Sequence, residues 1–398
     1  MIDFERESNN RIAIARIKVL GVGGGGSNMV NSMIDSTDYD MIDFIVANTD
    51  AQALKISKAP HKIQLGIKST KGLGAGANPE VGRRAAEEDL DSIIRQVKDA
   101  DVVFLTAGLG GGTGSGALPI IAQALQEKDI LSVAVVTKPF IFEGSRRAKV
   151  AEEALRKLTD VVDTLIVIPN QKLLDVVDQK VSLIDAFSRI NTVLNQFIKS
   201  IADIIAKPGH INVDFADIKT IMKQRGYAVI GTGKASGEDR AIRAAREAIA
   251  SPLLDNTSIV GARGVLLNIS GSSSLSLHEV GAASSIIYEE AHEDASIIVG
   301  SVIDESLGDE INITIIATGF DSPTRQERIE PARVTEPFKE PQAFTPQEAP
   351  PVHSDPFHKE VQVTPPAQKK PEEPEIDMND LEIPAIMRQM IKKKSDGA

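Results

Sequence analysis

The stretch AGLGGGTGSG, from Ala107 to Gly116, sets the pattern for the first half of this chain. Before it, Asp101–Thr106 (DVVFLT) is a short apolar run that predicts a buried strand. After it, a helical pattern begins at Ala117 (ALPIIAQALQEK), with apolar residues on one face. A glycine-rich turn between a strand and a helix leaves backbone N–H groups unpaired at the positive end of the helix dipole. The sequence therefore predicts a binding site for phosphate oxygens at this turn.

Length and composition restrict the class of protein. The chain has 398 residues, enough for two or three domains, and its 42% hydrophobic content is ordinary for a globular protein. A formal net charge of −12 argues against a nucleic-acid partner, because binding a phosphate backbone needs clustered Lys and Arg. The absence of cysteine excludes disulfides, thiolate metal sites and cysteine nucleophiles. The polar start (MIDFERESNN) and the lack of a long apolar run predict a cytosolic protein.

A second glycine-rich loop lies nearer the amino terminus. Gly21–Asn28 (GVGGGGSN) follows a strand predicted at Ile12–Leu20 and leads into a helix. The loop satisfies the G-x-G-x-x-G pattern, so a dinucleotide-binding domain has to be considered. That pattern alone is weak, and it leaves the identity of the nucleotide open.

Polar residues follow the next strand, which is predicted at Ile42–Ala47. They are Asn48–Asp50, at the strand end where open α/β sheets bind ligands. Asp50 fits two roles equally well, as a ribose-binding acid or as the cap of the helix that follows. A third glycine-rich loop, Gly72–Pro79 (GLGAGANP), precedes a helix predicted from Glu80.

Strands continue to alternate with helices along the first half of the chain. Further strands are predicted at Leu131–Thr137 and Thr164–Pro169, with an amphipathic helix that ends at Leu158 between them. This alternation predicts an α/β fold with a doubly wound, mostly parallel sheet and a ligand site at the carboxyl ends of its strands. We assign residues 1–181 to this nucleotide-binding domain.

A long central helix is predicted over residues 182–209. Apolar residues recur at helical spacing, Ser182 and Asp185 form a capping-box pattern, and Pro208 and Gly209 end the helix. A second, smaller α+β domain is predicted over residues 210–320. Its expected strands and helix are Ala228–Gly231, Gly264–Ser270, Ala295–Ser301 and Asn312–Thr318, with the helix at Gly237–Ala250.

The composition changes after Phe320. Thirteen of the twenty prolines lie from Pro323 onward, among polar residues, which predicts a disordered linker over residues 321–376. Apolar residues return in Asp377–Lys394 (DMNDLEIPAIMRQMIKKK), so residues 377–398 are predicted to be a docking peptide that folds on a protein partner. The alternative is a tail with no binding role.

The three glycine-rich loops restrict the class of nucleotide-binding protein that this chain can be. No G-x-x-x-x-G-K-[ST] sequence is present, which excludes a P-loop enzyme. A Rossmann-type, nicotinamide-dependent oxidoreductase explains Gly21–Gly26 but gives the other two loops no role. Several phosphate-binding loops at one sheet edge fit a nucleoside triphosphate better. A scaffold that binds the nucleotide without hydrolysing it is a third hypothesis.

The chain also resembles a known family. Gly110–Gly116 (GGGTGSG) matches the tubulin signature motif, and four other motifs occur with it: Gly21–Asn28, Asn48–Asp50, Gly72–Pro79 and Asn212–Asp217 (NVDFAD). Together they resemble the tubulin/FtsZ family of GTPases over Ile12–Phe320, and the tail is similar too. The resemblance implies a cytoplasmic GTPase that assembles head to tail into filaments of the bacterial cytokinetic ring. Its partners would be itself and, through Asp377–Lys394, division and membrane-tethering proteins.

Binding residues follow from the resemblance. Both phosphate loops are implied, through Gly24, Gly25, Gly26, Ser27, Asn28, Gly111, Gly112, Thr113 and Gly114. The end of the site near the γ-phosphate of GTP would include Asn48, Ala75, Gly76, Ala77 and Asn78. Glu143 and Arg147 would contact the ribose and phosphates. Asn170, Phe187 and Asn191 would contact guanine, although core packing of the long helix explains Phe187 equally well.

The resemblance also implies that Asn212, Asp214 and Asp217 are catalytic. From spacing alone, Asp214 and Asp217 share one side of a helix start, and an N-terminal cap is the simpler explanation. If Phe187 contacts the base, however, the long helix places these acids ~20–25 Å away, beyond its far end. The resemblance then implies that they polarise the attacking water at the nucleotide of the next subunit, with Mg²⁺ offsetting the phosphate charge.

Overall fold

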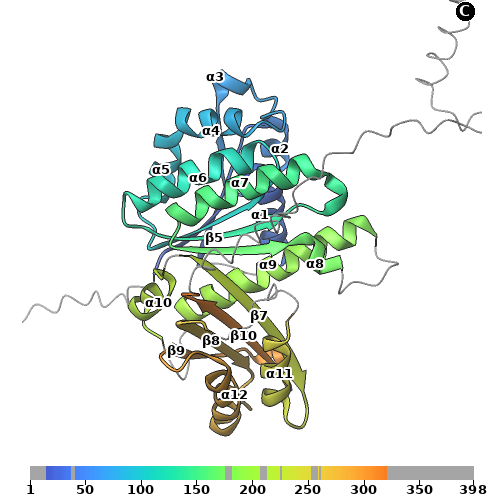
Figure 1. Ribbon diagram of the computed structural model, residues 1–398, viewed down its shortest axis with the longest axis vertical. Coiled ribbons are helices and arrows are strands. Elements are labelled where there is room, and N and C mark those ends of the chain that lie inside the picture. The colour runs from blue at the N-terminus through green and yellow to red at the C-terminus, as the bar shows by residue number, and fades with distance from the viewer. Residues whose placement is uncertain are drawn as a thin grey trace, which may run out of the picture. The chain divides into compact units, whose positions relative to one another are not determined.

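The computed structural model describes residues 15–36, 41–174, 182–206, 213–224, 226–251, 259 and 261–320. Residues 321–398, with the predicted linker and docking peptide, lie outside the described residues, as do Asn212 and positions 207–209 of the predicted long helix. The described residues form a ten-stranded sheet in which seven of the nine strand pairings are parallel (Figure 1). The predicted α/β class with a mostly parallel sheet is confirmed.

Six parallel strands make the first half of the sheet. They are β1 (Ile17–Val22), β2 (Ile42–Asn48), β3 (His61–Gln64), β4 (Val102–Gly108), β5 (Leu131–Lys138) and β6 (Thr164–Pro169). Their order in the sheet is β3-β2-β1-β4-β5-β6. The connections change direction between β1 and β4, and in open α/β sheets a ligand crevice opens outside the carboxyl ends of strands at such a point.

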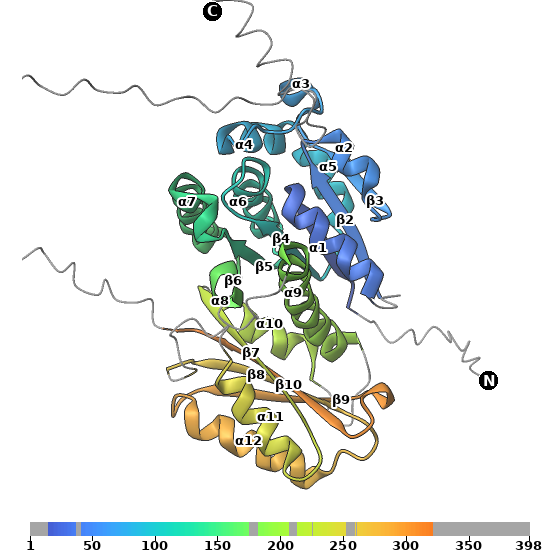
Figure 2. The same cartoon turned by 90° about the vertical axis from the view of Figure 1, so that its right-hand side faces the viewer.

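Helices cover both faces of this half. Their bounds are α1 (Gly23–Ser36), α2 (Ala51–Ile56), α3 (Ile67–Thr70), α4 (Pro79–Glu88), α5 (Leu90–Val97), α6 (Thr113–Gln126), η1 (Ile141–Glu143), α7 (Ser145–Val161), α8 (Asn170–Leu174) and α9 (Leu183–Ala206). Figure 2 shows α6 and α7 on one face and α1 and α9 on the other. Two separate cores result, one around Leu118 and Leu158 and the other around Met33 and Phe197. Strands buried on both faces need apolar side chains at successive positions, as β4 and β5 have.

The second half continues the same sheet with mixed pairing. Its elements are α10 (Phe215–Met222), β7 (Tyr227–Ser236), α11 (Arg240–Ile249), β8 (Gly264–Gly271), α12 (Leu277–Glu290), β9 (Ser296–Ile303), η2 (Glu305–Leu307) and β10 (Glu310–Thr318). Strand β10 is antiparallel to β7 and β8, while β9 is parallel to β8. Helices α11 and α12 cover one face of these strands, over a third core that includes Ala244, Ala283 and Ile313. All four predicted strands are present here, and α12 was not predicted.

A short pairing joins the two halves. Strand β6 pairs with β7 only at Leu165–Tyr227 and Ile166–Ala228. The sequence did not predict this continuous sheet, because the two strands are separated by α9 and α10 and no local pattern reports their pairing.

The long helix α9 has 24 residues, which corresponds to about 36 Å. Its predicted start is confirmed, since the Ser182 hydroxyl oxygen accepts the backbone N–H of Asp185 at 3.1 Å. The hydroxyl also donates to the Asp185 carboxylate at 2.7 Å.

The glycine-rich stretches Gly21–Asn28 and Ala107–Gly116 differ from the prediction in the same way, because in each the helix begins earlier than predicted. Helix α6 begins at Thr113, four residues before the predicted Ala117, and α1 begins at Gly23, inside the predicted loop. The glycines there form the first helical turns because the two loops lie too close together for side chains. A Cβ added at Gly25 would lie 2.9 Å from the backbone nitrogen of Gly108.

Candidate functional site

A cleft of about 380 Å³ opens at the carboxyl ends of β1, β4 and β5. Twelve of the predicted binding residues line it: Gly24, Gly25, Asn28, Gly111, Gly112, Thr113, Gly114, Glu143, Arg147, Asn170, Phe187 and Asn191. Six other lining residues were not predicted: Met29, Gly108, Leu109, Thr137, Pro139 and Ile190. Position was the available signal for Thr137, the last residue of a predicted strand, and for Gly108, which lies within the predicted phosphate-binding turn.

The amino ends of α1 and α6 meet in this cleft. An added Cβ at Gly23, the first residue of α1, would lie 3.0 Å from the backbone nitrogen of Gly114 in α6. The N-cap of α6 is Gly112, and no side chain caps it. Ser115 is buried, and its hydroxyl accepts the N–H of Gly110 at 2.9 Å, so Ser115 holds the loop in shape. Two helix amino ends with free N–H groups make a strong site for phosphate oxygens.

The third glycine-rich loop closes one end of this arrangement. The N–H of Gly74 donates to the carbonyl of Thr49 at 3.2 Å, which ties the loop to the end of β2. A Cβ at Gly112 would lie 2.8 Å from both the Asn78 nitrogen and the Ala75 Cβ. The hydroxyls of Thr49 and Thr113 are 2.7 Å apart, so the end of β2 also contacts the start of α6.

Asn48 and the segment Ala75–Asn78 adjoin the cleft without being among the residues that line it. Asn48 is 2% exposed, and its Nδ2 has no hydrogen-bond partner within the described part of the chain. Its Oδ1 accepts the N–H of Asp50 at 3.2 Å, which orients the amide. A buried amide donor without a partner is costly, and such groups are typical of a ligand contact.

Structural roles are observed for Asp50, Gly26 and Ser27, none of which lines the cleft. The Asp50 carboxylate accepts the N–H groups of Gln52 and Ala53, so of its two possible roles the helix cap is the one observed. Gly26 packs against the backbone of Thr106, and the hydroxyl of Ser27 donates to the Gly23 carbonyl at 2.8 Å. Gly26 and Ser27 thus support the phosphate loop from behind.

An acid and a base form one wall of the cleft. Arg147, in the first turn of α7, makes an ion pair with Glu143, the last residue of η1. The other Glu143 oxygen accepts the N–H of Phe140 at 2.9 Å, which fixes the carboxylate. Arg147 stays half-exposed and can turn toward a phosphate, for which a guanidinium is well suited.

The far end of the cleft is aromatic and amide-lined. Phe187 is 41% exposed although it lies on the largely buried helix α9, so core packing does not explain it. Its ring meets that of the buried Phe140 edge to face, with centroids 5.4 Å apart. Asn170 is buried with no partner for its Oδ1 among the described residues, and Asn191 also lines the cleft. A flat ring face beside two amides suits a nucleobase.

The predicted catalytic acids lie elsewhere. Asp214 is the N-cap of α10 and Asp217 is in its first turn; both are exposed, and the Asp214 side chain makes no capping hydrogen bond. Lys223, at the other end of α10, bonds Asp129 just before β5, and the Thr164 hydroxyl at the start of β6 donates to the Met222 carbonyl. Helix α10 therefore packs at the amino ends of β5 and β6, about 25 Å from the cleft along β5.

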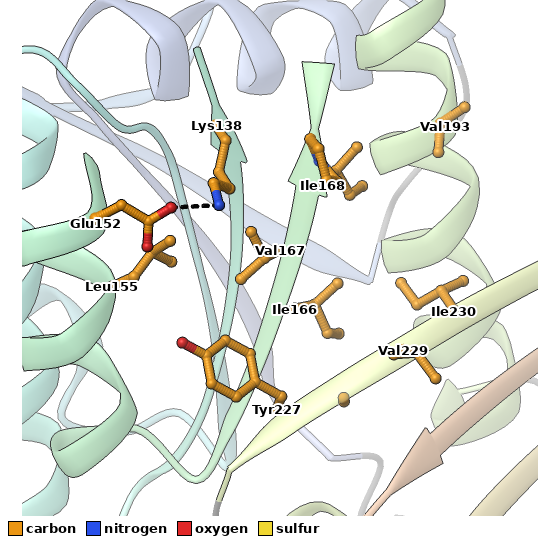
Figure 3. Close-up of a pocket in the computed structure, with 12 residues that line it drawn as sticks. Lys138, Glu152, Leu155, Ile166, Val167, Ile168, Val193, Tyr227, Val229 and Ile230 are labelled. Carbon is orange, nitrogen blue, oxygen red and sulfur yellow. Dashed lines mark ion pairs between the residues drawn. The ribbon is translucent and has the colours of Figure 1, made fainter. Parts of the chain in front are cut away.

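A second cavity lies between β6 and β7, where the two strands diverge (Figure 3). Its walls are mostly apolar, with Val167, Ile168 and Val229 among them, and a Lys138–Glu152 ion pair lies on one side. It holds no convergent set of polar groups, so we do not assign chemistry to it.

The described residues show neither a metal-binding cluster nor a membrane-spanning helix. They contain no group of three His, Asp or Glu side chains placed to hold a metal ion. Among them, no helix combines the length and the apolar character needed to span a membrane.

Comparison with known proteins places these features in context. Residues 16–178 match the GTPase-domain model of the Tubulin/FtsZ family, and residues 226–321 match the C-terminal-domain model of the FtsZ family. FtsZ from M. jannaschii, solved as an empty dimer, is 40% identical over 78% of this chain and 89% of its own, with a TM-score of 0.72.

Two proteins from Haloferax volcanii share the fold. CetZ1, a GDP-bound monomer, is 22% identical over 77% of this chain and 95% of its own, with a TM-score of 0.68. CetZ2, a GTPγS-bound protofilament, is 19% identical over 78% of this chain and 95% of its own, with a TM-score of 0.65. At these identities the likeness concerns the fold alone.

Proposed function

This chain belongs to the tubulin/FtsZ family of GTPases, and we propose that it binds GTP in the cleft, hydrolyses it to GDP and phosphate, and assembles head to tail into filaments. The observation that carries the proposal is the separation of two half-sites. Phosphate-binding loops lie at the carboxyl edge of the sheet, and the exposed pair Asp214 and Asp217 lies at the amino edge. Stacking subunits head to tail brings one edge against the other.

The nucleotide is proposed to lie along the cleft. Its phosphates contact the amino ends of α1 and α6, and its γ-phosphate lies toward Asn48 and the Ala75–Asn78 loop. Glu143 and Arg147 contact the ribose and phosphates. The base lies against Phe187, with Asn170 and Asn191 at its polar edge. Several of these contacts use groups that are half-exposed or unpartnered among the described residues: Arg147 and Phe187 are partly exposed, and the Asn48 Nδ2 and Asn170 Oδ1 have no partner.

Hydrolysis is proposed to require a neighbour. Asp214 and Asp217 of one subunit, with Asn212, polarise the water that attacks the γ-phosphate bound by the next subunit. Both carboxylates are exposed, and that of Asp214 is not used to cap its own helix, so they are free to contact another molecule. A head-to-tail contact of this kind does not close on itself and therefore builds open filaments. The dimer form of the 40% identical relative supports self-association.

Mg²⁺ is proposed to bind with the nucleotide. The described residues offer no three-ligand acidic cluster, while neutral oxygens of Thr49 and Thr113 lie at the phosphate loops. This donor set fits an ion that is held mainly by phosphate oxygens and water. When bound, the ion offsets negative charge on the phosphates.

Further partners are proposed from the tail. Asp377–Lys394, outside the described residues, would recruit membrane-tethering and other division proteins and so concentrate filaments at the division site in the cytoplasm. Its apolar residues and terminal lysines support this role.

A nucleotide titration tests the binding half of the proposal. Because the strand order β3-β2-β1-β4-β5-β6 is also that of Rossmann dinucleotide-binding domains, NAD is the informative competitor. We expect the purified chain to bind GTP and GDP, with NAD failing to displace them. Tight NAD binding without GTP binding would favour the oxidoreductase.

Turnover of an acid variant tests the catalytic half. Asp217→Ala should bind GTP within twofold of wild type, because Asp217 lies far from the subunit's own cleft, but its phosphate release should fall ~100-fold or more. Sedimentation with GTP against GDP measures assembly alongside. A loss of GTP affinity in the variant would contradict the assignment of these acids to the neighbour's site, and unchanged turnover would remove Asp217 from the mechanism.

A further inference from the structure

Asp129 has a backbone conformation that ordinary residues avoid. It lies in the turn between α6 and β5 with φ +55°, in the left-handed region that favours glycine. Only four non-glycine residues in the described part of the chain have a positive φ. Aspartate tolerates this region better than most residues do, at some energetic cost. The backbone there would suit glycine better, so the contacts of the Asp129 carboxylate are of interest.

The Asp129 carboxylate contacts two lysines. Asp129 Oδ1 is 2.6 Å from Nζ of Lys223, and Oδ2 is 3.7 Å from Nζ of Lys219. Both lysines belong to the α10 segment, one turn apart. The hydrogen bond from Lys223 holds the pKa of the Asp129 carboxyl below its ordinary value, and the same bond raises the pKa of Lys223. Without Asp129, two like charges would face each other across one helical turn.

The two lysines and the two acids lie on opposite flanks of α10. At 100° per residue, Lys219 is about 200° round the helix from Asp217, and the buried Ile218 and Met222 lie between the flanks. The rotation of the helix about its axis is therefore set by its buried face, Ile218, Ile221 and Met222, together with the contacts that restrain the lysine flank. That rotation determines the direction in which the side chains of Asp214 and Asp217 project from the surface.

We propose that Asp129 is a positioning residue for the catalytic acids: by binding Lys219 and Lys223 it fixes the orientation of α10 and aims Asp214 and Asp217 at the neighbouring subunit's nucleotide. The inference rests on the proposed function. Displacements of about 1 Å in a catalytic group can cost up to 100-fold in rate, so a weak surface contact can act strongly through geometry. Exposed ion pairs contribute little to stability, so the fold does not need this one.

Three variants of the full chain test the proposal. Asp129→Asn removes the charge and tolerates the left-handed backbone, and Asp129→Gly also relieves the backbone. Lys223→Met removes the main partner, and Lys223→Arg keeps the cation. Asp35→Asn is the matched control, because Asp35 makes a comparable exposed ion pair with Lys58, 2.5 Å away at the carboxyl end of α1.

We expect turnover at saturating GTP to fall about three- to fivefold in Asp129→Asn, Asp129→Gly and Lys223→Met. GTP affinity and the amount of protein that sediments with GTP should stay within twofold of wild type. Lys223→Arg should restore turnover, and combining Asp129→Asn with Lys223→Met should cost no more than Asp129→Asn alone.

The outcomes distinguish the positioning role of Asp129 from the proposed function on which it rests. If Asp217→Ala abolishes turnover while Asp129→Asn behaves like Asp35→Asn, the acids are catalytic and the positioning role of Asp129 is wrong. If Asp217→Ala turns over normally, the proposed function fails regardless of Asp129. Additive losses in the double variant, or reduced GTP affinity in Asp129→Asn, would also overturn the inference.

Discussion

Phe187 and Phe197 lie on the same helix, ten residues apart, in different surroundings. Phe197 is fully buried between α9 and the sheet, whereas Phe187 is 41% exposed in the cleft. Phe187→Ala should therefore weaken GTP binding about three- to tenfold, because aromatic contacts contribute about 0.5–1.5 kcal/mol, and should change stability by less than ~1 kcal/mol. Phe197→Ala should cost about 3–5 kcal/mol of unfolding free energy.

Nucleotide titration and urea unfolding of both variants measure the two effects. If Phe187→Ala destabilised the fold as much as Phe197→Ala while binding GTP normally, Phe187 would be a core residue and the base site would lie elsewhere.

Glu279 is tied to a buried cation. Arg240 is 7% exposed and bonds the Glu279 carboxylate at 2.6 Å, and this bond is the largest cause of the lowering of the Glu279 pKa from 4.5 to about 2. A folded-state pKa below the unfolded value stabilises the protein above pH 4.5, and the contribution is lost as the pH falls from 4.5 toward 2.

Glu279→Gln keeps the capping-box hydrogen bonds and removes the titration. We expect its unfolding free energy, measured in urea from pH 7 to 2, to fall less steeply than that of wild type in that window. Parallel curves for the two proteins would contradict the assigned pKa.

At the scale of elements, helices α4 and α6 can pack closely because α6 has a glycine where the two helices are in contact. A Cβ at Gly116 of α6 would collide with the Pro79 carbonyl of α4, whereas one at Gly281, in α12, would meet nothing within 4 Å. Gly116→Ala should push the helices apart and destabilise the protein by ~2–4 kcal/mol. Gly281→Ala should instead stabilise it by about 0.5–1 kcal/mol, because alanine is the better helix former.

Thermal unfolding compares the two substitutions directly. Equal effects of Gly116→Ala and Gly281→Ala would show that the close approach of α4 to α6 is not needed. GTP affinity should fall with Gly116→Ala only, because α6 also carries the phosphate loop.

Local patterns explain which elements the sequence could predict. Continuous apolar runs predicted β4 and β5 because both faces of these strands are covered by helices. Helix α12 was missed because its start follows a serine-rich run that resembles a loop. Ser276 and Glu279 nevertheless form a capping box there, which was a readable signal. The four-residue edge strand β3 carries almost no pattern.

The candidate site, like the fold, could be predicted in part from the sequence. Glycine-rich stretches after strands located the phosphate loops, and the family resemblance supplied Phe187, Asn170 and Asn191. The contacts of Asp129 with the α10 segment join parts of the chain that are far apart in sequence, and no local pattern reports them. Asp50 fitted two roles from the sequence, and only the observed hydrogen bonds to Gln52 and Ala53 separate them.

At the scale of the whole chain, the tail is proposed to serve recruitment and not catalysis. The docking peptide follows a predicted linker of residues 321–376, and every residue assigned to the cleft lies before it. Removing Asp377–Ala398 should leave GTP turnover within twofold of wild type and abolish binding to a membrane-tethering division protein on vesicles. Retained binding, or loss of turnover, would contradict the proposed role.

Complementation between two inactive variants tests whether the site is shared between subunits. Asp214→Ala keeps an intact cleft and loses an acid. Gly112→Val keeps the acids and crowds the phosphate loops, because even a Cβ at Gly112 would lie 2.8 Å from the Asn78 nitrogen. Each variant alone should be nearly inactive. In an equal mixture, one contact in four joins an intact cleft to intact acids, so turnover should recover to about one quarter of wild type.

Co-sedimentation of the two variants, each carrying a different label, establishes that Gly112→Val enters the filaments. Recovery should rise with the fraction of Gly112→Val, pass through a maximum near equal amounts and fall again, because either variant in excess leaves few productive contacts. A site contained within one subunit predicts no recovery at any ratio, since every molecule in the mixture then lacks one half of it. Co-assembly without recovery would therefore reject the shared site, while recovery that follows the product of the two fractions would establish it.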